Sequence, residues 1–277
     1  MRIAVVSGVH GNLAALQAVM EEIGRQERVE RILCAGDVVG LGPHPNEVID
    51  VLRDARADVV KGNYDDAVAF DRISSGVDFP DAESEQVDRR ALAWTRRTLT
   101  ADSMTYLRDL PFDVRLLDLG TRVEVRRNED QELKEFRRTF VNRLVFGSLA
   151  DRTPKSKTKR LLMVHGSSRA LNELIRSDTA NSILAAIAEH AKADVVITGH
   201  ADEGFTREHA GVLFIGVAGL SGPRTRPGQA GFMLIETRGG VRADWIPVSY
   251  DPSQHLRAIA ESGLPPALTA RFDLTSL

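Results

Sequence analysis

Short apolar runs recur along this chain, and each is followed by a polar turn that contains glycine. An apolar run of four or so residues bounded by turn residues is typical of a fully buried strand. In open α/β sheets, ligands bind in the crevice at the carboxyl ends of the strands. The pattern therefore predicts an α/β fold with a polar site assembled from several strand ends. The runs are residues 3–6, 32–35, 161–164 and 194–197, with a shorter run at residues 57–60.

The first part of the chain alternates strands with helices. Asn12 is placed to cap a helix that runs to about Gln26, because apolar residues recur behind it at helical spacing. A second helix is expected over residues 46–55, and a third strand and turn over residues 59–63. This strand–helix–strand–helix–strand order predicts a parallel sheet with right-handed crossovers.

The rest of the chain changes character twice. Residues 64–107 predict a cap or side layer of helices rather than sheet, and the last third returns to α/β and then to β patterns. The expected helices cover residues 83–99, 101–107 and 171–193, and the expected strands cover residues 114–119, 121–126 and 195–198, with several more within residues 211–245.

Residues 122–160 are rich in basic side chains, with twelve Lys or Arg against six Asp or Glu. Helical spacing runs across residues 130–144, and residues 148–159 have the composition of an exposed loop. We interpret the stretch as a basic surface insertion within a single domain that spans residues 1–277. A solvated basic face is one explanation of the charge, and an arm that contacts phosphate or nucleic acid is the other.

The overall composition is ordinary for a globular protein, with 43% apolar and 27% charged residues. The net charge of −3 gives no global case for nucleic-acid or membrane binding. Cys34 is the single cysteine, which suits a reducing compartment. The chain opens directly on a strand, which leaves no room for a signal peptide, and it lacks the ~18-residue apolar run of a membrane span. We therefore expect a cytoplasmic protein.

Six side chains in the polar turns suit a metal site. A mixed set of imidazole, carboxylate and amide ligands favours Mn, Fe, Zn, Co or Ni over Ca or Mg. Taken singly, a histidine at a helix entry or an aspartate that caps a turn has a structural explanation. Two of the histidines each end an apolar strand beside a glycine, which allows close backbone approach. The candidate ligands are His10, Asp37, Asn63, His165, His200 and Asp202.

The five turns resemble the motifs of the calcineurin-like metallophosphoesterases, in the bacterial single-domain branch related to small phosphodiesterases. Those motifs are Asp-x-His-Gly-Asn, Gly-Asp-x-x-Gly, Gly-Asn-His-Asp, Val-His-Gly-Ser and Gly-His-Thr-His. The resemblance spans the chain except the basic insertion, and it implies a four-layer α/β/β/α sandwich of two mixed sheets flanked by helices. The matching stretches, in the same order, are residues 8–12, 36–40, 62–65, 164–167 and 199–202.

The resemblance implies that one half of a two-metal site is intact. Asp37 matches the carboxylate that bridges the two metals in the family. Asn63, His165 and His200 match the further ligands of one of them. We therefore expect this chain to hold at least one divalent metal ion.

The other half departs from the family pattern. His10 matches the histidine of the first family motif. Gly8 replaces the aspartate of that motif, and Asp202 replaces the last histidine of the fifth motif. We hypothesise that His10, Asp37 and Asp202 form a remodelled second metal site, because a carboxylate oxygen is an acceptable ligand. An exposed Asp202 beside an empty position is the alternative.

The resemblance also implies catalytic and substrate-binding residues. His10 and Asp37 take catalytic roles, and Tyr64 replaces the family's general-acid or phosphate-contacting His. With a reference pKa of about 10, a tyrosine is the poorer proton donor at neutral pH, and simple ring packing is the alternative explanation. Arg224 ends a stretch similar to a family phosphate loop, where a guanidinium fork suits phosphate, although a plain surface arginine fits as well. His44, between two prolines, follows the bridging ligand, but nothing fixes its direction.

These observations lead to one expected function and two alternatives. We expect a hydrolase, either a phosphatase or a phosphodiesterase, that cleaves a phosphorylated small molecule or nucleotide-type substrate with metal-activated water, manganese being one candidate metal. The first alternative is a catalytically inactive homologue that binds a metal or phosphorylated ligand as a scaffold or sensor. The second makes the basic insertion a nucleic-acid contact. The oligomeric state stays open.

Overall fold

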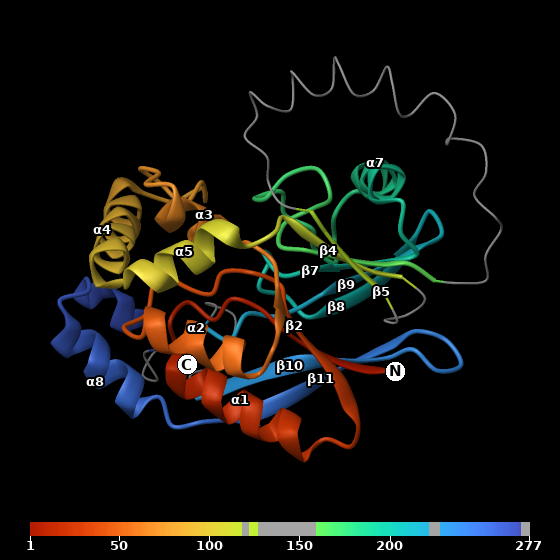
Figure 1. The fold of residues 1–277 in the computed structure, drawn as a ribbon. Helices are drawn as coiled ribbons and strands as arrows, with labels where there is room; N and C mark the ends of the chain where they lie inside the picture. The colour runs from red at the N-terminus through yellow and green to blue at the C-terminus, as the bar shows by residue number, and fades with distance from the viewer. Residues whose placement is uncertain (118–121, 127–158, 222–227, 273–277) are drawn as a thin grey trace.

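The computed structural model describes residues 1–117, 122–126, 159–221 and 228–272, which form two β-sheets packed face to face (Figure 1). The first sheet contains β1 (Arg2–Val6), β2 (Val29–Cys34), β3 (Asp58–Val59), β10 (Gln229–Glu236) and β11 (Arg242–Ser249). The second contains β4 (Asp113–Leu117), β5 (Arg122–Arg126), β6 (Leu161–Val164), β7 (Val195–Thr198), β8 (Phe205–His209) and β9 (Val212–Gly216). The strand orders are β11-β10-β1-β2-β3 and β5-β4-β6-β7-β9-β8.

Both sheets are mixed. In the first, β1, β2 and β3 are parallel, as the alternating pattern predicts, while β10 and β11 pair antiparallel along one side. In the second, β6, β7 and β9 are parallel, and β4, β5 and β8 add antiparallel pairs. The parallel strands of each sheet therefore bring several polar turns to one end of that sheet.

Helices cover the outer faces. Asn12 caps α1 as predicted, because its side-chain oxygen accepts a hydrogen bond of 3.1 Å from the backbone N–H of Ala15. The helices are α1 (Leu13–Arg25), α2 (Pro45–Asp54), α3 (Asn63–Ala69), α4 (Ala82–Thr98), α5 (Ala101–Asp109), α7 (Asn181–Ala191) and α8 (Ser253–Ser262), and a 3₁₀ helix spans Pro266–Phe272.

Three apolar layers separate the sheets and helices. Alternate residues of a strand face opposite sides, so Ile3 of β1 packs between the two sheets while Ala4 packs toward the helices. In β6, Met163 likewise lies in the layer between the sheets, and Leu162 lies against α7. Two buried sheets with helices outside each confirm the predicted four-layer α/β/β/α sandwich.

One predicted helix is too long. The pattern predicts helix over residues 171–193, but α7 begins only at Asn181. The preceding residues form turns instead, because Thr179 accepts a 2.7 Å hydrogen bond from the backbone N–H of Arg176 and donates its own backbone N–H back to that residue. Arg207 also donates to the carbonyls of Ser177 and Thr179. These contacts occupy backbone groups that a helix would need for itself.

Most of the predicted basic insertion, residues 127–158, lies outside the described residues, so its helix, its loop and its role stay predictions. Among the described residues, no helix is both long and apolar enough to cross a membrane.

Candidate metal centre

Five polar turns meet where the carboxyl ends of the two sheets come together. Gly8 donates its backbone N–H to Gly36 across the first sheet, and Gly199 does the same to His165 across the second. The two sheets are joined by Nδ1 of His165, which lies 2.7 Å from the carbonyl oxygen of Ala35. The strand ends that the sequence predicted as a common site are therefore in direct contact.

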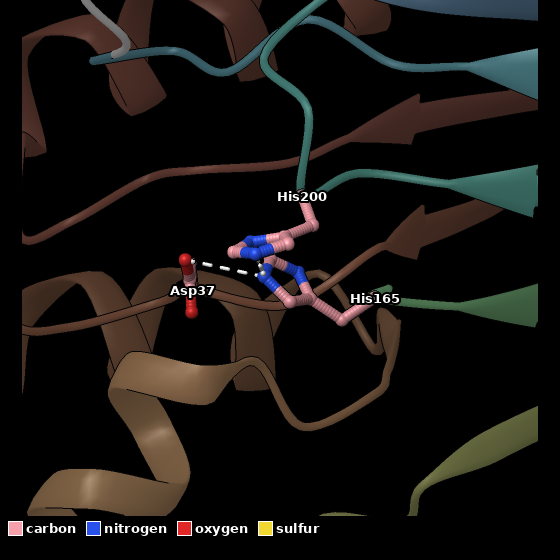
Figure 2. Close-up of side chains that lie close together, drawn as sticks. All are labelled: Asp37, His165 and His200. Atoms are coloured by element: carbon pink, nitrogen blue, oxygen red, sulfur yellow. Dashed lines mark hydrogen bonds and ion pairs between the residues drawn. The ribbon is translucent and has the colours of Figure 1, made fainter. Parts of the chain in front are cut away.

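Four predicted ligands converge on one point. Ligand atoms of Asp37, His165 and His200 all lie within 4.8 Å of one another, and Figure 2 shows the carboxylate and the two rings turned toward each other. Nε2 of His165 is 3.3 Å from Oδ2 of Asp37 and 3.1 Å from Nδ1 of His200. Oδ1 of Asn63 completes the group at 2.9 Å from the same Nε2.

Neighbouring groups orient the ligand atoms. The carbonyl of Ala35 can only accept, so Nδ1 of His165 carries a proton and Nε2 faces the cluster. The amide of Asn63 donates to the carbonyl of Ser75 at 2.9 Å, which turns Oδ1 toward His165. Such outer contacts fix tautomer and direction in metal sites.

The donor set fits a divalent cation. Lone pairs of one carboxylate, one amide and two imidazoles point at a shared centre. A proton on Nε2 of His165 could form hydrogen bonds with only some of the other three groups. A cation satisfies all four at once, and the mixed nitrogen and oxygen set suits Mn, Fe, Zn, Co or Ni. Asp37, Asn63, His165 and His200 are therefore the residues that would hold it.

The charges in the cluster keep Asp37 ionised. Burial alone would raise the pKa of Asp37, but the adjoining His165, together with His10 and His200, holds it below its usual range. Burial would lower the pKa of His165, yet the Asp37 carboxylate raises it overall. Burial and the neighbouring His165 lower the pKa of His200 to about 4, so its ring is neutral and able to ligate at neutral pH.

Asp65 is a site residue to which sequence reasoning gave no role. Its carboxylate accepts backbone hydrogen bonds from Val38 and Val39 at 2.9 and 3.1 Å, and from Gly62 at 2.9 Å. Burial and the Asp37 carboxylate raise the pKa of Asp65. Asp65 thereby ties the turn that carries Asp37 to the turn that carries Asn63. Its place in the Gly-Asn-Tyr-Asp fragment was the available signal.

Close approach explains two glycines of the turns. A Cβ on Gly199 would lie 2.0 Å from Oγ of Ser7. A Cβ on Gly62 would lie 2.1 Å from Oδ1 of Asp37. Contacts this short are impossible, so both positions require glycine for the five turns to meet.

The altered half of the site lies against the same aspartate. Nε2 of His10 is 3.7 Å from Oδ2 of Asp37, and its Nδ1 is 3.3 Å from the carbonyl of Val39. The ring of Tyr64 meets His10 edge to face, with centroids 4.8 Å apart. The backbone N–H of Tyr64 donates to Oδ1 of Asp37 at 2.9 Å.

Asp202 fills the space beside Gly8. A Cβ built on Gly8 would lie 3.0 Å from Oδ1 of Asp202 and 2.9 Å from Cα of Gly219. A longer side chain at position 8 therefore has no room without displacing that carboxylate. Gly8, which lacks the side chain found in the family, and Asp202, which adds a carboxylate, thus lie next to each other.

These residues line a cavity of about 660 Å³. Its polar wall includes His10, Asp37, Tyr64, His200, Asp202 and Arg176. Arg176 was not anticipated, because a single arginine outside the five motifs carries no pattern. His44 is not among the lining residues; it precedes α2 and acts electrostatically on His255 of α8. Arg224 lies outside the described residues.

Sequence comparison gives a family and one curated relative. Residues 1–240 match the family described as the calcineurin-like phosphoesterase superfamily domain. An uncharacterised protein of Methanocaldococcus jannaschii is 33% identical over 109 residues, which are 39% of this chain. The match spans only 42% of that relative's own length.

Two solved structures share the fold. A hypothetical protein of Pyrococcus horikoshii OT3 matches with a TM-score of 0.71 at 19% identity, over 97% of this chain and 96% of the other. A metallophosphoesterase of Sphaerobacter thermophilus matches with a TM-score of 0.64 at 24% identity, over 98% of each chain. With the family match over most of its length, this chain belongs to the calcineurin-like phosphoesterase superfamily.

Proposed function

We propose that this protein is a metal-dependent phosphoesterase that hydrolyses phosphomonoesters or phosphodiesters. The observation that carries the proposal is the convergence of Asp37, Asn63, His165 and His200 in a chain of this superfamily, with Asp37 and His200 lining a cavity. A divalent cation held by these side chains supplies Lewis acidity, lowering the pKa of a water ligand and offsetting charge on phosphoryl oxygens.

The chain's own groups have distinct tasks in this proposal. Asp37 stays ionised and supplies the negative charge that retains a cation. His10 lies on the cavity wall with Nε2 toward Asp37, and when this nitrogen holds no metal it can exchange a proton with the reacting ester or water. Tyr64 packs edge-on against His10 and limits the positions that this ring can adopt.

We extend the proposal to a second, weaker metal position formed by His10, Asp37 and Asp202. The contact between Gly8 and Asp202 supports it, because a carboxylate stands close to the place where the family carries one on residue 8. The charge of the donor set is then nearly preserved. Metal counting on the wild type and on Asp202→Ala measures whether this position fills.

The cavity supports a substrate with an organic group of nucleotide size. Its volume of about 660 Å³ exceeds what a phosphate alone needs. Val77, Phe79 and Leu174 add an apolar portion to the wall, and an apolar or aromatic leaving group would pack there. A phosphorylated small molecule or nucleotide-type substrate would therefore suit both the polar and the apolar part of the cavity wall.

The test uses nitrophenyl phosphate and bis-nitrophenyl phosphate with Mn, Ni, Co or Zn. His200→Ala is expected to lose at least about 100-fold in kcat/KM, because even partners that only orient metal ligands are worth 10–100-fold. His190→Ala is the matched control, since this histidine is exposed on α7 away from the cavity. Equal turnover by the wild type and His200→Ala would overturn the proposal.

A second candidate function rests on the altered half of the site. Gly8 offers no ligand and Tyr64 is a weak proton donor at neutral pH, which favours a protein that binds a metal and a phosphorylated ligand without turning it over. The same assay separates the two. Metal binding that His200→Ala abolishes, with no hydrolysis of either ester by the wild type, would support this alternative.

A further inference from the structure

Arg176 places a guanidinium at the wall of the cavity. Its side chain contributes to the cavity wall, and its Nε is buried with no hydrogen-bond partner in the described part of the chain. Asp37, Asp78 and Asp202 line the same cavity, yet within the described residues Arg176 forms an ion pair with none of them. A buried guanidinium nitrogen left without an acceptor is costly, which points to an acceptor that the protein itself does not supply.

The turn that carries Arg176 is held firmly. Ile175 is fully buried in the apolar layer under α7. Thr179 exchanges two hydrogen bonds with the backbone of Arg176, and Nη1 of Arg207 donates to Ser177 and Thr179 at 2.8 and 2.6 Å. The backbone of the turn is thus fixed before any ligand arrives, which lowers the entropy cost of binding.

The guanidinium acts on the same space as the candidate metal ligands. Arg176 lines one cavity together with Asp37 and His200 of the cluster. With a divalent cation held by Asp37, Asn63, His165 and His200, an anion placed between Arg176 and the cluster would meet positive charge on both sides. A phosphoryl group satisfies this arrangement, because its oxygens can accept two parallel N–H bonds from one guanidinium.

We propose that Arg176 is a substrate-binding residue that receives the phosphoryl oxygens of the ester in this cavity. The inference rests on the proposed phosphoesterase function and adds the residue that recognises the reacting group. The role of Arg176 in this proposal is to orient the phosphoryl group and to offset its negative charge through the guanidinium fork.

The test measures binding of inorganic phosphate to the full chain by titration calorimetry, once after EDTA treatment and once with one equivalent of Mn. Arg176→Gln is expected to weaken phosphate binding at least about tenfold, which corresponds to about 1.4 kcal/mol. Arg176→Lys keeps the charge without the fork and is expected to lose less. Arg238→Gln, in the exposed turn between β10 and β11, removes the same charge elsewhere and should leave the affinity unchanged.

Equal phosphate affinity in the wild type, Arg176→Gln and Arg176→Lys would overturn the inference, as would a wild type that binds no phosphate at millimolar concentration. Melting curves of each variant show whether weaker phosphate binding is caused by unfolding. If Arg176→Gln is unstable, the phosphate affinity of Arg176→Lys is compared with that of the wild type instead. Failure of the proposed function is separate, since it is read from ester turnover. Phosphate binding that depends on Arg176 in a protein without turnover would keep this inference and reject the enzyme.

Discussion

At the residue scale, Gly8 and Asp202 are neighbours in space in the altered half of the site. The Asp202 carboxylate lies at the space where a side chain on Gly8 would begin. Asp202, His10 and Asp37 also share a left-handed backbone, with φ values of 50°, 47° and 55°. Asp and His enter this region more readily than most residues, but it still carries strain, and strain of this kind clusters at functional sites.

If Asp202 serves as a ligand, its removal empties one metal position and leaves the other. We expect wild-type protein soaked in excess Mn and desalted to carry two ions per chain, and Asp202→Ala to carry one, measured by plasma mass spectrometry. Asp78→Ala is the control, because Asp78 lines the same cavity away from the cluster. A wild type that retains at most one ion per chain would reject the second position.

At the element scale, the strands and their polar ends were predictable because their signals are local. A short apolar run followed by glycine identifies β1, β2, β6 and β7, and motif order singles out Asp37, Asn63, His165 and His200. Residues 171–180 were predicted wrongly, because their turn depends on Arg207, about 30 residues further along the chain. Arg176 could not be found from sequence, since its significance lies in its position on the cavity wall and in its buried Nε, which has no hydrogen-bond partner among the described residues.

Helix α8 carries a buried histidine that gives the fold a pH dependence. Burial, and then the neighbouring His44, lower the pKa of His255 to about 4, against an ordinary value of 6.5. Between these values the unfolded chain binds more protons than the folded one, so the free energy of unfolding falls as pH drops from about 6.5 toward 4. The loss is on the order of a few kcal/mol.

We therefore expect His255 to lower the free energy of unfolding of EDTA-treated wild type between pH 7 and pH 5, as measured by urea unfolding, while Asp65 with its raised pKa acts in the opposite direction. His255→Leu removes the titrating group and should show a smaller loss between the two pH values. His190→Leu, exposed on α7, should behave like the wild type. The same loss in His255→Leu as in the wild type would assign the acid sensitivity to other groups.

At the scale of the whole molecule, the candidate centre lies between the two sheets. Asp37 and Asn63 follow strands of the first sheet, and His165 and His200 follow strands of the second. An apolar layer packs the two sheets against each other, and the cluster lies at the edge of that layer. Both therefore hold the two sheets together. A cation bound there contacts only the assembled form and stabilises it.

Metal should accordingly raise the melting temperature. At a free concentration of one hundred times Kd, binding adds about 2.7 kcal/mol to the free energy of unfolding. For a chain of this size that is a rise on the order of 5–10 °C. Fluorescence melting of EDTA-treated protein with increasing Mn measures it. His200→Ala should lose the rise and His190→Ala should keep it; an equal rise in both variants would place the bound metal elsewhere.

The separation of the donors along the chain has a consequence for biosynthesis. Asn63 and His165, which meet at 2.9 Å, are 102 residues apart in sequence. At about 5–20 residues per second, a ribosome completes Asp37 and Asn63 about 5–20 s before it adds the first of the two strand-end histidines. Until then, Asp37 and Asn63 are the only members of the four-residue cluster that the nascent chain contains, and both supply oxygen donors. Under the proposed function, the four-residue cluster that would hold the metal is therefore complete only after translation has passed residue 200.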